Sequence, residues 1–150
     1  MTELMEKILS RENMMQACKK VKAKNGASGV DGIGTEEIRE YLIENWEEIR
    51  EKIKKRKYKP QPVLRVEIPK PSGGTRNLGI PSVVDRIIEQ AIVQVITPIV
   101  EPYFSEYSYG FRPKRSAQQA VLKLLEYFND GYLYVVDIDL EKFFDNVPQD

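Results

Sequence analysis

The sequence predicts an α+β fold that is mostly helical, with a β-hairpin in the middle and one further strand near the C-terminal end. Apolar residues recur at helical spacing in four stretches, which begin near residues 3, 35, 82 and 116. Two short runs flank a Pro- and Gly-rich joint, and a β-branched and aromatic run occupies Tyr132–Val136. With 150 residues, 41% of them hydrophobic, the chain can form one domain, or one domain and part of another.

Two helical regions separated by a glycine-rich loop are predicted in the first half of the chain. Residues 3–24 have helical spacing, with a break near Ser10. Four glycines make residues 25–34 a loop, and Thr35 is the predicted N-cap of the next helix. The apolar face of that helix consists of Ile38, Leu42, Trp46, Ile49 and Ile53. The two prolines of residues 60–62 are expected to end it.

A hairpin and a long apolar helix are predicted next. Val63–Pro69 and Thr75–Ile80 are the two strands of the hairpin. Ser82 followed by Asp85 is a capping-box variant that opens a helix, and the prolines within residues 98–102 are expected to close it. The apolar stripe of this helix, predicted to belong to the core, consists of Val84, Ile87, Ile88, Ala91, Ile92, Val95, Ile96 and Ile99.

The last helix and the last strand complete the predicted fold. Ser116 with Gln119 is a second capping box. The predicted buried face of this helix consists of Ala117, Ala120, Val121, Leu124, Leu125 and Phe128. Gly131 then turns the chain into the Tyr132–Val136 strand. Because an isolated strand is not stable, we expect it to pair with strands encoded beyond Asp150 and the chain to be a fragment.

Two carboxylates follow this strand and are candidate metal ligands. Asp137 and Asp139 stand at i and i+2, so they share one face of the strand, roughly 6.5–7 Å apart. Buried carboxylates are normally paired, hydrogen-bonded or bound to a metal, and oxygen ligands suit Mg²⁺. In the competing interpretation, Asp137 pairs with Lys142 or a distant arginine, and Asp139 caps the turn into Leu140–Phe144. The spacing leaves both interpretations open.

Cysteine content and hydropathy restrict the class of protein. Cys18 is the only cysteine, which excludes an internal disulfide and favours the cytoplasm, and its helical setting predicts an inert thiol. No apolar run approaches ~20 residues, and the N-terminus lacks the apolar core of a signal peptide. We therefore expect no membrane association.

Charge is distributed unevenly, although the formal net charge is zero. Arg50–Arg76 contains ten basic residues and two acids, so a basic block lies on a mildly acidic chain. Nucleic-acid binding depends on local charge, and this block is a candidate RNA-binding surface. In the alternative interpretation, Lys52–Lys59 is a solvated helix end where basic residues favour the dipole.

The hairpin places two cations beside its turn. Lys70 and Arg76 lie on opposite sides of the joint, where both could bind one polyphosphate, the lysine as a point charge and the arginine as a fork. The alternative is an exposed hairpin with ordinary edge charges.

The loop at residues 104–115 is aromatic and ends in a basic cluster. The candidates for stacking on bases or sugars are Tyr107, Tyr109, Phe111 and Arg112. The alternative, which we favour for Tyr109 and Phe111, is a turn held by buried aromatic rings. Lys114 and Arg115 are candidate phosphate contacts.

Three segments in this order resemble the reverse transcriptase encoded by group II introns, the intron maturase. They are Ile68–Arg86 (IPKPSGGTRNLGIPSVVDR), Phe104–Ala117 (FSEYSYGFRPKRSA) and Val135–Val147 (VVDIDLEKFFDNV). The Gly29–Gly32 loop resembles the N-terminal extension of this family. The resemblance implies that residues 1–130 are the fingers with their N-terminal extension. It implies that residues 131–150 are the first strand and catalytic motif of a truncated, right-hand polymerase palm.

The resemblance also implies roles for individual residues. Asp139 is the catalytic, metal-binding aspartate, Asp137 is a neighbour, and the backbone carbonyl of Leu140 is a second ligand. The cofactor is Mg²⁺, in a two-metal site completed by residues beyond 150. The implied dNTP-binding residues are Lys70, Arg76, Phe143 and Phe144, with Phe144 as the steric gate against a ribonucleotide 2′-OH. The implied or candidate RNA- and template-binding residues are Arg65, Lys54, Lys55, Lys57, Gly29, Arg112, Lys114 and Arg115.

The function implied is an RNA-directed DNA polymerase that copies intron RNA and assists its splicing. Its partners would be group II intron RNA, an RNA template with a DNA primer, and dNTPs, in a cytoplasmic, nucleoid or ribonucleoprotein setting. Apolar surface exposed by a truncated palm would favour a homodimer. The fragment alone is expected to be inactive, because the second palm motif is absent. Two alternatives remain: an RNA-binding splicing module, or the same region of a retron, diversity-generating or CRISPR-associated reverse transcriptase.

Overall fold

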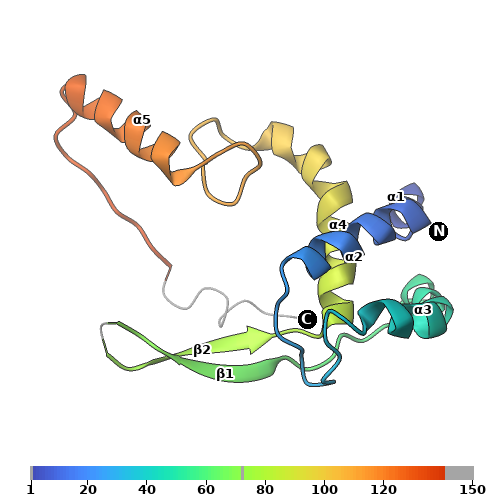
Figure 1. The fold of residues 1–150 in the computed structure, drawn as a ribbon. Helices are drawn as coiled ribbons and strands as arrows, with labels where there is room; N and C mark the ends of the chain where they lie inside the picture. Colours follow the sequence, from blue (N-terminus) through green and yellow to red (C-terminus); the bar gives the residue numbers. More distant parts are fainter. Residues whose placement is uncertain (1, 72, 141–150) are drawn as a thin grey trace. The chain divides into compact units, whose positions relative to one another are not determined.

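The computed structural model describes residues 2–71 and 73–140. They divide into two compact units, Met1–Pro102 and Tyr103–Asp150. The elements of the first unit are α1 (Glu3–Ile8), α2 (Arg11–Ala23), α3 (Ile38–Lys54), β1 (Leu64–Pro69), β2 (Thr75–Ile80) and α4 (Val83–Val100) (Figure 1). A 3-10 helix, η1, spans Glu101–Tyr103, and the second unit contains α5 (Ala117–Asn129). The α+β class is confirmed, and the division into fingers and palm at residue 130 stays a prediction.

The core lies in the first unit, where α1 and α2 contact α4. Ala17 of α2 and Ala91 of α4 are both completely buried, and small residues of this kind let two helices approach closely. The Asn13 side chain donates to the Ala91 carbonyl at 3.0 Å and so joins the same two helices. The buried apolar residues of the core are Ile8, Leu9, Met14, Ala17, Val21, Ile38, Ile49, Val83, Val84, Ile87 and Ala91.

The apolar face predicted for α3 is confirmed. Ile38 and Ile49 are buried, and Leu42, Trp46 and Ile53 pack against the core. Steps of three and four residues keep these side chains on one side of the helix, so the period in the sequence matches the packing.

Cys18 lies half-buried on α2. Burial raises the pKa of its thiol, and the nearby Lys22 opposes that shift only in part. Because the thiolate is the reactive form, the structure supports the prediction of an inert thiol.

Helix starts were predicted well with one exception. Ser10 breaks the first helical region as expected, and its side chain accepts a hydrogen bond from the Asn13 N–H. The prediction of Thr35 as an N-cap is wrong, because α3 begins at Ile38 after a turn. The buried Thr35 hydroxyl donates instead to the Asn25 side chain at 3.1 Å and ties the two ends of the glycine-rich loop.

Two helix ends differ from the prediction. α3 ends at Lys54, before the prolines, because Arg56 takes a left-handed conformation with φ of 55°. α4 continues through Pro98 to Val100, because a proline so near the end removes only one hydrogen bond. The α4 stripe is only partly core: its buried residues end at Ala91 and Val95 packs against them, whereas Ile92 and Ile99 are exposed.

β1 and β2 form the predicted antiparallel hairpin (Figure 1). The register runs from Leu64 opposite Ile80 to Pro69 opposite Thr75. The Lys70 N–H donates to the Gly74 carbonyl at 2.9 Å and closes the turn. Gly74 has φ of 80°, a conformation that glycine adopts without a steric penalty.

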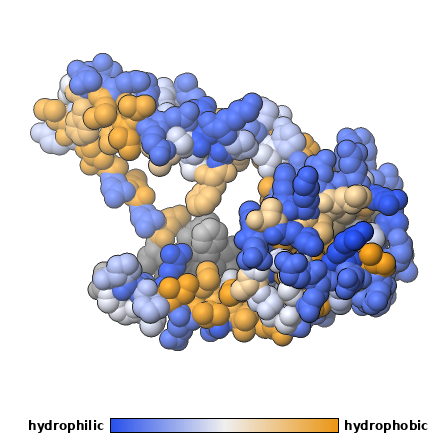
Figure 2. Space-filling model, viewed as in Figure 1, coloured by the Kyte–Doolittle hydropathy of each residue, from blue (hydrophilic) through white to orange (hydrophobic). Residues whose placement is uncertain are grey.

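α5 begins at the predicted capping box, in which Ser116 and Gln119 exchange side-chain to backbone hydrogen bonds. The predicted buried face is wrong, since no residue of α5 is buried, and Val121 and Leu125 are more than half exposed. Figure 2 shows this apolar surface over α5 and the segment that follows it. An apolar stripe is buried only against a second layer, and α5 is the sole α-helix described in its unit.

The strand predicted over Tyr132–Val136 is not formed in the structure. Residues 132–140 have no regular secondary structure, and β1 and β2 pair only with each other. A strand needs a partner for its backbone groups, and the described residues supply none here.

Within residues 2–71 and 73–140, no helix combines the length and the apolar character needed to span a membrane.

Candidate functional site

Lys70 and Arg76 both lie near the tip of the hairpin. Arg76 stands opposite Ile68, and Lys70 is the first residue after β1, two positions past Ile68. Continuing the alternation of β1 by one residue would place Lys70 diagonally across from Arg76, on the same side. Diagonal neighbours of this kind are about 7–8 Å apart in an antiparallel pair. Both residues are exposed. Both cations are therefore near the tip, and their joint binding of a triphosphate stays a prediction.

The same face of the hairpin is apolar below the two cations. Leu64, Val66 and Leu78 share it and are between 37% and 39% exposed. Apolar surface along the hairpin is visible in Figure 2. Arg65 occupies the opposite face, so the structure does not bring this predicted template contact together with Lys70 and Arg76.

Asp85 anchors the base of the hairpin to the start of α4. Its carboxylate accepts hydrogen bonds from the Tyr58 hydroxyl at 2.6 Å, the Gln61 N–H at 2.9 Å and the Ser82 hydroxyl at 2.8 Å. The Asp85 N–H in turn donates to the Ser82 oxygen at 3.1 Å. Asp85 is 4% exposed, so these bonds replace water around a buried carboxylate.

This role of Asp85 was missed at the sequence level. The capping pattern identified the Ser82 to Asp85 bond, which is local and was confirmed. The bonds from Tyr58 and Gln61 join residues 27 and 24 positions apart, which no local pattern indicates. Burial and the adjacent Asp85 carboxylate raise the pKa of Tyr58 well above its ordinary value, so its hydroxyl remains a donor.

The glycine-rich loop at residues 25–34 is held against the start of α4. The Arg86 side chain donates to the Ala27 carbonyl. A Cβ atom at Gly29 would lie 2.7 Å from the Ser82 Cα and 2.8 Å from the Ser82 nitrogen. Gly29 is therefore required by a close approach of two backbones. Its predicted contact with template stays a prediction.

The basic block at the end of α3 is partly neutralised. Glu51 forms ion pairs with Lys54 at 3.3 Å and with Lys55 at 3.4 Å. Lys57 and Lys59 are exposed, and among the described residues no ion pair to them is found. Of the three lysines of this block that are predicted to bind RNA, Lys54, Lys55 and Lys57, the last therefore has the least neutralised charge among the described residues.

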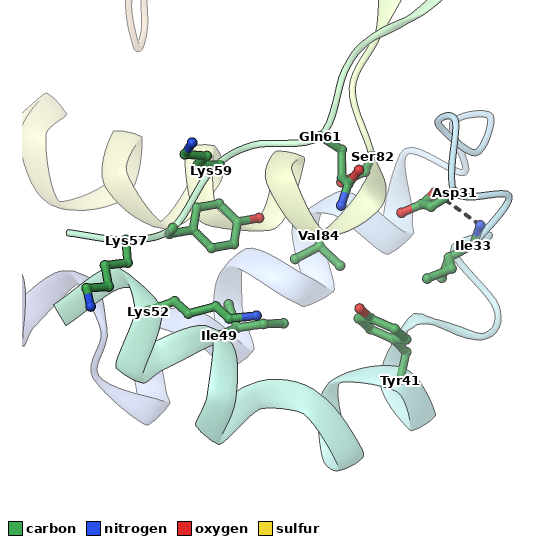
Figure 3. A pocket seen from close by; sticks show the side chains of 11 residues that line it. Asp31, Ile33, Tyr41, Ile49, Lys52, Lys57, Lys59, Gln61, Ser82 and Val84 are labelled. Atoms are coloured by element: carbon green, nitrogen blue, oxygen red, sulfur yellow. Dashed lines mark hydrogen bonds between the residues drawn. The ribbon is translucent and has the colours of Figure 1, made fainter. Parts of the chain in front are cut away.

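A cavity of about 300 Å³ lies beside this lysine pair (Figure 3). It is enclosed by α3, the segment that leads into β1, the start of α4 and the glycine-rich loop. Its lining consists of Asp31, Ile33, Tyr41, Ile49, Lys52, Lys57, Tyr58, Lys59, Gln61, Ser82 and Val84.

The arginines of the loop at residues 104–115 hold the loop itself. Arg112 donates to the carbonyls of Ser105 at 2.5 Å and Ser108 at 2.9 Å. Arg115 donates to the Glu106 carbonyl at 3.1 Å and lies 5.5 Å from the centre of the Tyr109 ring. These bonds use part of the donor capacity that nucleic-acid contacts would need.

Other residues of this loop have different surroundings from those predicted. Phe111 was expected to be a buried anchor and is fully exposed, with φ of 56°. Tyr109 is half-buried, and Lys114 is exposed with φ of 60°. Phe111 and Lys114 are thus available to a partner, and their contacts with RNA stay predictions.

Asp139 and Leu140 end the described part of the chain. Both are exposed, and the Asp139 carboxylate accepts the Leu140 N–H at 2.9 Å. Within the described residues, no group of three histidine, cysteine or acidic side chains is placed to hold a metal ion. Phe143 and Phe144, the other predicted dNTP-binding residues, lie outside the described residues.

A cationic hairpin tip, a lysine-rich segment at the end of α3 and the exposed Asp139 are the parts that the resemblance predicts for a nucleotide-joining polymerase. The α+β fold is compatible with that class of protein. The family described as reverse transcriptase (RNA-dependent DNA polymerase) matches residues 68–150, more than half of the chain. The chain belongs to this reverse transcriptase family, as its sequence motifs predicted.

Two relatives and one solved structure illustrate the match. Protein YkfC of Escherichia coli (strain K12) is 34% identical over an alignment of 150 positions, which covers 96% of this chain and 39% of YkfC. The group II intron-encoded protein LtrA of Lactococcus lactis subsp. cremoris is 35% identical over 118 residues, 78% of this chain and 18% of LtrA. The chain thus spans less than two thirds of either relative. A chain in the solved structure of a Cas6-RT-Cas1--Cas2 complex has a similar fold, with a TM-score of 0.55 and 23% sequence identity. The match covers 97% of this chain and 14% of the chain in that structure, and at this identity it shows the fold alone.

Proposed function

We propose that this chain is the fingers, and the opening of the palm, of a reverse transcriptase that copies intron RNA into DNA and binds that RNA to assist splicing. The family match and the likeness to group II intron-encoded LtrA support the proposal. One structural observation carries it: Lys70 and Arg76 flank the turn of the hairpin, which the Lys70 N–H closes on the Gly74 carbonyl at 2.9 Å, inside the segment that the family matches. Two adjacent cations suit a triphosphate better than a single phosphate.

In this proposal, the hairpin binds the incoming nucleotide. The Lys70 ammonium and the Arg76 guanidinium neutralise the triphosphate, which orients its α-phosphate toward the primer end. Asp85 fixes the base of the hairpin through Gln61, so that the two cations are held by a supported element. By resemblance, Phe144 excludes the 2′-OH of a ribonucleotide.

Mg²⁺ is the metal implied by the family resemblance. The exposed Asp139 carboxylate and the Leu140 carbonyl are hard oxygen donors of the type that Mg²⁺ prefers, and they would hold it. When bound, the metal would activate the primer 3′-OH and stabilise charge on the pyrophosphate leaving group. Other ligands would come from outside the described residues, because these contain no group of three candidate ligands.

Primer extension on an RNA template by the full-length protein tests the role of the hairpin. Lys70→Ala and Arg76→Ala are each expected to raise the KM for dNTP about 10- to 100-fold, the value of one charge-assisted hydrogen bond. Lys7→Ala is the matched control, since Lys7 forms only an exposed ion pair with Glu3. An unchanged KM in both hairpin variants would contradict the proposal.

A second candidate function is an RNA-binding module that acts mainly in splicing. The free charge of Lys57 at the end of α3 favours it. Reversing the charge at Lys54, Lys55 and Lys57 is expected to weaken intron RNA binding and to flatten its salt dependence. Asp139→Ala should leave this binding intact. Binding that is insensitive to the charge reversal would exclude this surface as the RNA site.

A further inference from the structure

The cavity beside the lysine pair has side chains of opposite charge at its two ends. In Figure 3, Lys57 and Lys59 lie at one end and Asp31 lies at the other. Lys52 also lines the cavity, but its ammonium is paired with Glu48 at 2.6 Å. The unneutralised cations are therefore at one end, and a carboxylate is at the opposite end.

The middle of the cavity is aromatic and apolar. Tyr41 and Val84 face each other across it in Figure 3, and Ile49 contributes to the floor. Tyr58 also lines it, with a hydroxyl fixed on Asp85 at 2.6 Å, so this ring is held in one orientation. A rigid aromatic wall is a surface on which a planar ring can stack at little entropic cost.

The acidic end can accept a hydrogen bond. One oxygen of Asp31 accepts the Ile33 N–H at 3.2 Å, and no bond to its other oxygen is found among the described residues. The Gln61 side chain lines the same region, while its backbone N–H is bound to Asp85. A carboxylate and an amide together can recognise the donor edge of a nucleobase.

We propose that this cavity binds one unpaired nucleotide of single-stranded RNA, a proposal that rests on the proposed function. The phosphate would lie on Lys57 and Lys59, the base against Tyr41 and Tyr58, and the donor edge of the base toward Asp31. The volume of about 300 Å³ is at the lower limit for ligand pockets, which admits one nucleotide and excludes a duplex.

The position of the cavity separates this site from the proposed triphosphate site. The cavity is at the base of the hairpin, where Gln61 precedes β1, whereas Lys70 and Arg76 are at the tip. A nucleotide in the cavity would contact both the glycine-rich loop and the anchored start of α4. Binding there would hold an RNA strand without occupying the tip.

An abasic scan of a single-stranded RNA with the full-length protein tests the base contact. Removing the one base that enters the cavity is expected to weaken binding to the unmodified protein about 5- to 100-fold, as loss of one stacked base does. Tyr41→Ala should weaken binding to the intact RNA to a similar extent and should show no further loss with the abasic RNA. Equal sensitivity of Tyr41→Ala and the unmodified protein to the abasic RNA would overturn the proposal.

A second variant avoids any dependence on the folding of Tyr41→Ala. The exposed pair Lys57→Ala and Lys59→Ala is expected to weaken single-stranded RNA binding about tenfold or more at low salt, with a smaller salt slope. Lys19→Ala with Lys20→Ala is the matched control, two exposed lysines on α2 outside the cavity lining. Equal effects of the two pairs would overturn the proposal, because they would indicate general charge attraction.

Crosslinking from RNA that carries a photoreactive base locates the occupant. Adducts on Tyr41 or Tyr58 support the proposal, and adducts confined to other residues overturn it. Primer extension by the same variants separates the two proposals. If every cavity variant extends primers and binds RNA as well as the unmodified protein does, only the cavity proposal is overturned, and another occupant such as a peptide is favoured. If the unmodified protein neither extends primers nor binds RNA, both the cavity proposal and the proposed function are rejected.

Discussion

Asp85 connects the segment before the hairpin to the start of α4 through one carboxylate. It accepts from Tyr58 and Gln61 before the hairpin and from Ser82 at the start of α4. The buried carboxylate is tolerated because all three donors hydrogen-bond to it. Removing it would leave those donors without their acceptor.

Replacing this carboxylate by an amide is expected to be costly. Asp85→Asn turns one acceptor end into a donor that faces other donors, so we expect a loss of about 2–4 kcal/mol in the free energy of unfolding. Urea denaturation followed by circular dichroism measures it. Glu36→Gln, an exposed acid-to-amide change, is the control and should stay within about 0.5 kcal/mol. A comparable effect of the two variants would contradict the anchoring role.

Tyr58 should make stability fall at alkaline pH. Its folded-state pKa is raised above the ordinary value of about 10, because of burial and the Asp85 carboxylate. Above pH about 10 the unfolded chain loses this proton while the folded chain keeps it. The free energy of unfolding should then fall by up to about 1.4 kcal/mol per pH unit from this group. Tyr58→Phe should remove that part of the slope between pH 10 and 11, and identical slopes would refute the assignment.

At the scale of elements, the glycine-rich loop and α4 meet through a backbone contact. Gly29→Ala would place a Cβ 2.7 Å from the Ser82 Cα, so we expect a destabilisation of about 1–3 kcal/mol. Gly34→Ala is the matched control, because the nearest atom to its Cβ is a side-chain oxygen of Glu37 at 3.9 Å. Thermal denaturation compares the two variants, and equal melting temperatures would show that the loop can move away from α4.

The elements were predictable where their signals are local. The joint with its proline and two glycines indicated the hairpin and hence the position of Lys70 and Arg76 on either side of its turn, and the Ser82 cap indicated the start of α4. The buried face predicted for α5 was wrong, and the Tyr132–Val136 strand is not formed among the described residues. Each needs a partner surface, which for the strand was expected beyond Asp150. The Asp85 network and the cavity were missed because they join segments distant in sequence, which periodicity does not report.

At the scale of the whole molecule, burial is concentrated in one unit. Every buried residue that the structure describes lies within Met1–Pro102, and none of those from 103 to 140 is buried. Limited proteolysis of residues 1–150 should therefore cut within 103–140 first and leave a product near residue 102, because local opening costs least where burial is low. Mass spectrometry of the products checks this, and early cuts within α2 or α4 would contradict it.

Residues 1–150 alone are expected to show no primer extension. In the proposed mechanism Asp139 contributes one carboxylate, and two-metal chemistry needs more than one. An assay with an RNA template, annealed DNA primer, dNTPs and Mg²⁺ measures this, with the full-length protein as the positive control. Extension above background by residues 1–150 would contradict the expectation.

Because the base of the hairpin is anchored, β1 and β2 could be lengthened without displacing that base. Since Gln61 and Ser82 are fixed on Asp85, residues inserted into β1 and β2 would displace only the tip. One residue added to each strand would turn Lys70 and Arg76 to the other side of the ribbon, whereas two would restore their side and extend the tip by about 7 Å. A ladder of such insertions would function as a molecular ruler for the distance between the hairpin and the nucleotide that it binds.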